Sequence, residues 1–155
     1  MAKVIGIDPG LSGGVTVFGC GSPLAIYKMP VVKSGTKKVL DTHNFVEILK
    51  AFNDVDVAVI EKVHAMPGQG VSSMFNFGMG FGILQGALAA LSIPMLFVTP
   101  QTWQKGIFNG IDSKLGKKRS IVYCKSRWPD IGKWSDGTAD AACIALYGAN
   151  QLCSK

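Results

Sequence analysis

The hydrophobic positions in the first 30 residues predict three short strands. Residues 3–8 (KVIGID) form an apolar, β-branched run that ends before Pro9-Gly10. Residues 13–18 (GGVTVF) and 24–29 (LAIYKM) follow after short polar or glycine-containing turns. Strands joined by connections this short pair side by side in opposite directions, so this part of the chain is typical of an antiparallel meander.

Beyond residue 38 the pattern changes to an alternation of helices and strands. Leu40, Phe45, Leu49 and Phe52 recur at helical spacing and predict a helix over residues 39–52. The remaining hydrophobic segments predict strands at 55–60 and 94–98 and helices at 72–91, 100–108, 117–128 and 136–151. This order predicts an α/β fold: one domain over residues 1–155, with a mixed five-stranded sheet, the first strand at its centre and helices on both faces.

A long segment without charge lies in the middle of the chain. No Asp, Glu, Lys or Arg occurs from Val63 to Gln104. Polar residues and glycines interrupt its apolar run and no basic cluster flanks it, so a helix buried in protein is favoured over a membrane span. Gly78, Gly82 and Gly86 recur every fourth residue and place a groove on one helix face. The sequence leaves open whether that groove receives a helix of the same chain or a second subunit.

The charge of the chain favours a polyanionic partner. Its 16 basic and 10 acidic residues give a formal net charge of +6. Eight of the basic residues lie in residues 101–135, where only two acids oppose them: Lys105, Lys114, Lys117, Lys118, Arg119, Lys125, Arg127 and Lys133. Such a concentration is typical of a nucleic-acid-binding surface, although a solvated helix face would have the same composition.

The cysteines and the N-terminus indicate an intracellular protein. The four cysteines show no C-x-x-C spacing and no accompanying histidine cluster, which disfavours a zinc site and a disulfide framework. We expect them to be reduced core residues. The first residues lead directly into a strand and lack the features of a signal peptide, so we expect a cytoplasmic location.

Two acidic residues stand where predicted strands end. Asp8 follows the apolar run of the first strand, and Glu61 follows VDVAVI in the fourth. If the two strands are parallel neighbours, their acids converge at the edge where α/β sheets usually place ligand sites. The alternatives are a turn-forming Asp before Pro9-Gly10 and a surface Glu paired with Lys62.

Two more acids, Asp136 and Asp140, are four residues apart at the start of the last predicted helix. This spacing places both on one helix face, near the positive end of the helix dipole. Either Ser135 or Asp136 is suited to cap the helix, so Asp136 has a structural alternative. Asp140 lies among alanines that predict close packing on a sheet, and an acid facing that way needs a partner.

The four acids together predict a divalent-metal site. Like charges at close range raise each other's pKa, and cations relieve the repulsion. Carboxylate ligands suit Mg²⁺ or Mn²⁺, and two such ions about 4 Å apart promote phosphodiester hydrolysis. Only two histidines are present, so no Ser-His-Asp or Cys-His arrangement competes. His64, three residues after Glu61, either assists at the site or contacts DNA, or has no functional role.

Five segments of the chain resemble the RuvC family of Holliday-junction resolvases, the crossover junction endodeoxyribonucleases. They are IGIDPGLSGG (5–14), VIEKVHAMPGQG (59–70), FVTPQTWQKGIF (97–108), KKRSIVYC (117–124) and DGTADAACIALYG (136–148). The likeness spans nearly the whole chain. The shortness of the chain and its glycine-rich middle look closer to the phage-borne branch than to the typical bacterial enzyme.

This resemblance implies a ribonuclease H-like fold, a homodimer and Mg²⁺-dependent nicking of opposite strands across a four-way DNA junction. It implies that the metal-binding acids are Asp8, Glu61, Asp136 and Asp140. The last two are four residues apart here rather than the usual three, which makes Asp136 the least secure of the set.

The resemblance also bears on DNA binding. Lys105 and Lys117 or Lys118 match basic positions near the cleaved or flanking phosphates, and neighbouring Arg119 joins this predicted DNA-binding set. Many relatives have an aromatic residue where this chain has His64. Phe75 and Phe77 are nearby substitutes, although we expect both in the core.

Three other functions are compatible with parts of this pattern. The D-P-G-L-S-G-G turn is similar to the phosphate-binding hairpin of sugar kinases and actin-like ATPases, but those proteins close two domains over ATP. A non-catalytic junction-binding protein would gain nothing from four acids that repel phosphate. A nuclease of the same fold that cuts flaps or RNA/DNA hybrids is the main alternative, because its metal chemistry is identical.

Overall fold

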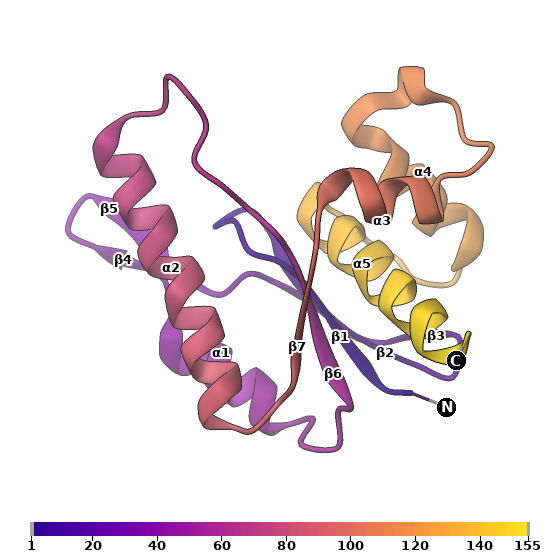
Figure 1. Cartoon of the computed structure of the whole chain (residues 1–155), viewed down its shortest axis with the longest axis horizontal. Coiled ribbons are helices and arrows are strands. Elements are labelled where there is room, and N and C mark those ends of the chain that lie inside the picture. The colour runs from indigo at the N-terminus through magenta and orange to yellow at the C-terminus, as the bar shows by residue number, and fades with distance from the viewer. Residues whose placement is uncertain (1, 155) are drawn as a thin grey trace.

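The computed structural model describes residues 2–154 and is built on a five-stranded mixed sheet (Figure 1). The strand order is β3-β2-β1-β6-β7; β1 pairs antiparallel with β2 and parallel with β6. The predicted sheet, with the first strand at its centre, is confirmed. Its strands are β1 (Val4–Asp8), β2 (Gly14–Gly19), β3 (Ser22–Lys28), β6 (Val57–Glu61) and β7 (Met95–Val98).

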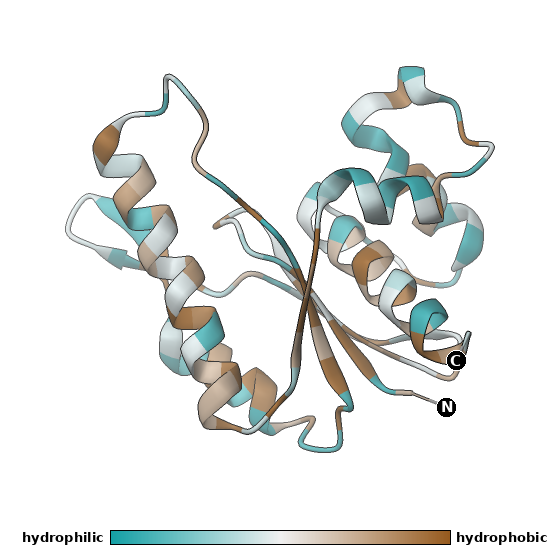
Figure 2. Ribbon diagram, viewed as in Figure 1, coloured by the Kyte–Doolittle hydropathy of each residue, from teal (hydrophilic) through white to brown (hydrophobic). Residues whose placement is uncertain are grey.

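Helices cover both faces of this sheet, as the sequence predicts. On one face lie α1 (Thr42–Lys50) and α2 (Val71–Ala90); on the other lie α3 (Pro100–Ile107), α4 (Arg119–Arg127) and α5 (Asp136–Cys153). Successive side chains of a strand point to opposite faces. Val4 therefore packs with α5, while Ile5 and Ile7 pack with α1 and α2. Burial on both faces explains the nearly continuous hydrophobicity of β1 and β6, visible in Figure 2.

The packing of α5 on β1 is close enough to require glycine. A Cβ atom at residue 6 would lie 2.1 Å from the carbonyl oxygen of Ala141. A Cβ atom at Gly137 would lie 2.2 Å from the carbonyl oxygen of Ser12, in the turn that follows β1. The backbone of α5 therefore rests directly on the sheet and on this turn, and its position along β1 is fixed.

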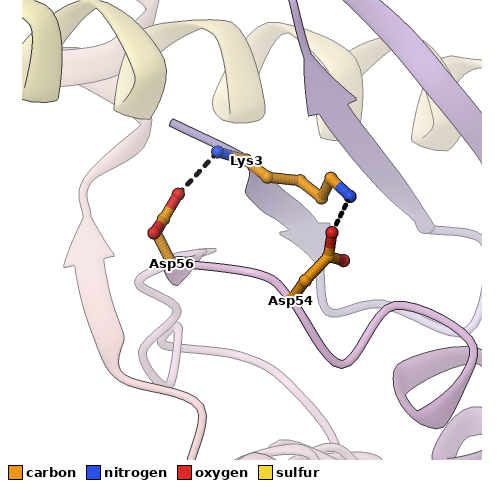
Figure 3. A network of polar contacts seen from close by, with 3 residues as sticks. All are labelled: Lys3, Asp54 and Asp56. Atoms are coloured by element: carbon orange, nitrogen blue, oxygen red, sulfur yellow. Dashed lines mark hydrogen bonds and ion pairs between the residues drawn. The ribbon is translucent and has the colours of Figure 1, made fainter. Parts of the chain in front are cut away.

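The beginning of β1 is tied to the segment that precedes β6 (Figure 3). The backbone N–H of Lys3 donates to the Asp56 carboxylate at 2.7 Å, and the Lys3 ammonium forms an ion pair with Asp54. These contacts align the two parallel strands at the end opposite to their acids.

A hairpin over residues 31–40 corrects the predicted helix boundary. Strands β4 (Val31–Ser34) and β5 (Lys37–Leu40) pair antiparallel around Gly35, whose φ is +63°. The helix begins at Thr42, where the Asp41 side chain accepts a hydrogen bond from the backbone of Asn44. Leu40 continues the helical spacing only by coincidence, because it is a buried residue of strand β5.

One helix boundary and the burial of two cysteines also differ from the predictions. The segment predicted as a helix from residue 117 begins as a 3₁₀ turn, η1 (Ser113–Lys118), and the α-helix starts only at Arg119. The four cysteines are free, as expected, but only Cys124 and Cys143 lie in the core, and Cys20 and Cys153 are exposed.

The prediction that α2 is buried is wrong for its N-terminal half. Val71 is 85% exposed and Phe75 is 70% exposed, whereas Leu84 and Leu88 near the other end are in the core. A 20-residue helix is longer than the sheet beneath it, so only its C-terminal part is covered. Lack of charge therefore did not indicate burial here. No helix within residues 2–154 is long and apolar enough to cross a membrane.

The contact at Gly6 gives a first prediction. Gly6→Ala should lower the free energy of unfolding by about 3 kcal/mol or more, because the added methyl overlaps the α5 backbone. Gly80→Ala is the matched control: a Cβ atom there meets no atom within 4 Å, and alanine favours helix. Urea unfolding of both variants tests this, and equal stabilities would contradict the packing described.

Candidate active site

Two of the predicted acids converge at the carboxyl edge of the central parallel strands. The register between β1 and β6 pairs Ile7 with Ile60, and the next residues along the strands are Asp8 and Glu61. The polypeptide then turns away sharply after β1, where the N–H of Gly13 donates to the carbonyl of Gly10 at 2.8 Å. Neighbouring parallel strands thus place the two carboxylates side by side, as the sequence predicts.

Helix α5 brings Asp140 to the same edge. Asp140 directly precedes Ala141, whose carbonyl rests on Gly6 of β1. The start of α5 is fixed by Ser135, which caps the helix: its side chain accepts from the N–H of Thr138, and the Thr138 hydroxyl accepts from the N–H of Ser135. The capping role therefore belongs to Ser135 and not to Asp136.

The four predicted acids are not equivalent in this arrangement. Asp8, Glu61 and Asp140 are partly buried; the charges of Glu61 and Asp140 raise the pKa of Asp8, and the charge of Glu61 raises that of Asp140. Asp136 is exposed in the first turn of α5. Its charge raises the pKa of Asp140, one of the three partly buried acids. The structure thus gathers three acids and leaves the fourth at the margin, so the ligand role of Asp136 stays a prediction.

Burial and mutual repulsion make these carboxylates reluctant to ionise. Burial raises the pKa of Asp8 to about 7; the charges of Glu61 and Asp140 add to this, while a hydrogen bond from the N–H of Gly10 opposes it. Burial likewise raises the pKa of Asp140 to about 6 and raises that of Glu61. None of the three forms a salt bridge with a basic side chain in the described part of the chain.

Two neutral donors that sequence reasoning missed hold the acids in place. The indole N–H of buried Trp103 in α3 donates to Glu61 at 2.7 Å. The hydroxyl of buried Ser120 in α4 donates to Asp140. Both residues lie within segments that suggested a family resemblance, but a tryptophan and a serine at helical positions give no signal that they face an acid.

The carboxylates have the right chemistry to bind a divalent cation, but they do not surround a cation site as they stand. Carboxylate oxygens are the ligands that Mg²⁺ and Mn²⁺ prefer. Among residues 2–154, no three His, Cys, Asp or Glu side chains lie close enough together to hold a metal ion as they stand. Trp103 and Ser120 each engage one carboxylate oxygen, and the acids repel one another. A cation would draw the remaining oxygens inward, because it removes that repulsion.

The predicted DNA-binding residues lie on, or directly before, the two helices whose side chains donate hydrogen bonds to the acids. Lys105 is exposed on α3, two residues after Trp103; Lys117 and Lys118 are exposed just before Ser120. Arg119 is half-buried instead: its guanidinium lies 4.9 Å from the centre of the Phe108 ring and donates to Gln104. Arg119 thus joins α4 to α3, and its contact with DNA stays a prediction.

His64 lies in the segment between β6 and α2, and the two nearby aromatic residues, Phe75 and Phe77, lie in α2. His64 is exposed and lines a pocket of about 150 Å³ together with Phe77. The expectation that Phe75 and Phe77 belong to the core is wrong, since Phe77 is 39% exposed and Phe75 still more. The cause is the uncovered N-terminal half of α2.

Comparison with solved structures identifies the architecture. RuvC of Thermus thermophilus in complex with a Holliday-junction substrate superposes with a TM-score of 0.75, covering 99% of this chain and 96% of the other. The fold is that of RuvC. A second T. thermophilus RuvC structure gives a TM-score of 0.64, with coverage of 98% and 96%.

This likeness is one of backbone rather than of sequence. The two RuvC structures are 17% and 16% identical to this chain. No protein-family model matches the sequence, and no curated protein matches it either. The comparison therefore establishes a RuvC-like, ribonuclease H-like fold.

The raised pKa values predict an unusual dependence of stability on pH. A carboxyl group whose pKa is higher in the folded state stabilises the fold below its unfolded pKa, near 3.8, and this contribution is lost as the pH rises through the folded pKa. The metal-free protein should therefore lose about 2–4 kcal/mol of unfolding free energy between pH 5 and pH 8. Mg²⁺ should restore stability at pH 8 and have little effect at pH 5.

Urea unfolding in EDTA and in Mg²⁺ at the two pH values measures this effect. Asp8→Asn should flatten the dependence, because it removes the acid whose pKa is raised most. Asp130→Asn, at an exposed position whose charge does not act on the three acids, is the matched control and should keep it. A metal-free protein equally stable at both pH values would show that the acids do not interact as described.

Proposed function

We propose that this protein is a divalent-metal-dependent endonuclease that resolves four-way DNA junctions and related branched DNA by hydrolysing phosphodiester bonds in opposing strands. The observation that supports this most directly is the meeting of Asp8, Glu61 and Asp140 at one sheet edge, partly buried and without a basic partner among the described residues. Such a cluster is costly to ionise without cations. The RuvC-like fold and the adjacent lysines favour branched DNA as the substrate.

Asp8, Glu61 and Asp140 would hold the metal, with Asp136 available from the exposed side. When bound, divalent ions supply Lewis-acid activation of water and stabilisation of the leaving oxygen. The protein contributes position: Trp103 and Ser120 each fix one carboxylate oxygen, so that the other oxygen remains available. Lys105, Lys117 and Lys118 would orient the phosphate backbone without reading its sequence.

Cleavage of a defined set of DNA substrates tests the proposal. In Mg²⁺ the protein should introduce symmetric nicks into a labelled four-way junction, and EDTA should abolish them. Asp8→Asn should lower the rate at least about a thousandfold, because one of three acids that hold the metal is lost. The same variant should still bind the junction, since it removes a negative charge.

Three-way junctions, flaps, linear duplex and RNA/DNA hybrid serve as the comparison substrates. Preferential cutting of flap or hybrid would retain the metal site and assign the protein to another nuclease activity of this fold. Full activity of Asp8→Asn would refute the mechanism. Binding without cleavage of any substrate would leave a non-catalytic junction-binding protein.

We also propose that the enzyme acts as a homodimer that packs through α2. Val71, Phe75, Gly78, Gly82 and Gly86 follow helical spacing along one face, and all five are exposed. A Cβ atom at Gly78, Gly82 or Gly86 meets no atom of the described chain within 4 Å. The face has no charge, so the same face of a second copy can approach it without repulsion. Two copies would bring two active sites to one junction.

Gly82→Leu tests this interface. The side chain would fill the groove and separate the two helices, so the protein should become monomeric and cut the two strands independently. Gly80→Ala, on the opposite side of α2, should leave the dimer intact. Sedimentation velocity gives the mass, and a cruciform plasmid separates paired from single incision. A wild-type monomer, or a dimeric Gly82→Leu variant, would exclude this interface.

A further inference from the structure

A second basic surface lies in a pocket that the proposed mechanism does not use. The pocket has a volume of about 580 Å³, and its walls include Lys28 of β3, Lys125 of α4 and Lys133 and Trp134 of the segment before α5. Ser135, which caps α5, also lines it. None of the pocket-lining residues is acidic.

This pocket flanks the acids on the side opposite to Lys105. Lys28 pairs with Gly14 of β2, and Gly14 pairs with Asp8, so Lys28 lies two strands from Asp8 at the same level of the sheet. Adjacent strands are about 4.8 Å apart, which places the Lys28 backbone roughly 10 Å from that of Asp8. Lys105 lies on α3, which follows β7 at the other edge of the sheet.

The three lysines form no salt bridge with any other described residue. All three are exposed, and the salt bridges found within residues 2–154 involve other residues. The two acids next to the pocket in sequence, Asp130 and Asp136, do not line it. Three ammonium groups on one cavity repel one another and attract a polyanion.

Trp134 adds an aromatic surface and an unsatisfied donor. Its ring lies 6.0 Å from that of Trp128, tilted by 34°. Its indole N–H is buried and meets no acceptor among the described residues. Lysines around an aromatic wall are typical of grooves that hold a nucleic-acid strand.

We propose that this pocket binds the backbone of the DNA strand beside the cut, so that the acids lie between two basic surfaces. The three lysines take phosphates, and the indole packs against a sugar or base. This inference rests on the proposed nuclease function, which it deepens by placing the path of the strand across the site. The path runs from Lys105, Lys117 and Lys118, over Asp8 and Asp140, to the pocket.

The test compares junction binding by two triple variants, each made in the Asp8→Asn background to prevent cleavage. The pocket variant combines Lys28→Gln, Lys125→Gln and Lys133→Gln. The control variant combines Lys33→Gln, Lys38→Gln and Lys50→Gln, which removes the same charge from exposed positions on β4, β5 and α1. Fluorescence anisotropy over a series of salt concentrations gives the affinity and its salt dependence.

The pocket variant should bind the junction about ten- to a hundredfold more weakly than the parent at 100 mM salt, and its slope of log affinity against log salt should be shallower by roughly two to three. In ethylation interference, the pocket variant should no longer be sensitive to ethylation of the phosphates on one side of the cut. Its sensitivity to those on the other side should remain. Trp134→Phe, which keeps a ring but removes the N–H, should weaken binding less. Thermal unfolding confirms that the exposed substitutions leave the fold intact.

The outcomes separate this inference from the proposed function. If the wild-type protein cuts junctions but the pocket variant binds like its Asp8→Asn parent, or no worse than the control, the pocket is not a strand site and the function stands. If the protein cuts nothing yet the pocket variant alone loses DNA binding, the pocket stands and the nuclease proposal fails. If the parent binds no DNA, both are overturned.

Discussion

The backbone of α5 lies directly on β1, and the rest of the site depends on this contact. Gly6 leaves no side chain between the strand and the carbonyl of Ala141, and Gly137 does the same between α5 and the turn after Asp8. The helix can therefore approach the strand this closely only where these glycines lie, which sets its position along β1. Because Asp140 precedes Ala141, this contact also fixes one acid of the helix against the two acids of the strands. The contact that packs the core thus also sets the positions of the acids in the site.

The acids are held in a state that favours a cation. Burial and mutual repulsion raise the pKa of Asp8 and Asp140 towards neutrality, and the hydrogen bonds from Trp103 and Ser120 fix carboxylate positions without supplying positive charge. The basic residues are close by but outside this cluster, where phosphate can reach them. This separation of charge is what a phosphodiester hydrolase requires, because a lysine paired with the acids would compete both with metal and with DNA.

The two helical layers have different surfaces, which suits different partners. The layer formed by α3, α4 and α5 presents lysines on either side of the acids, whereas α2 presents an uncharged face with three exposed glycines. A polyanion is attracted to the first surface, and a second copy of the same helix fits the second. In the proposed enzyme the sheet edge would therefore meet DNA while α2 joins the subunits.

The sequence by itself determined the sheet, its central strand and the convergence of Asp8 and Glu61, because apolar runs of strand length that end in an acid are local signals. It also indicated Asp140, whose alanine-rich surroundings require close packing. Tertiary structure alone decided that Asp136 remains exposed, that Trp103 and Ser120 face the acids, and that half of α2 is uncovered. It also gathered Lys28, Lys125 and Lys133 into one pocket. These features join residues far apart in the chain, and hydrophobic periodicity reports which face of an element is apolar but not what covers it.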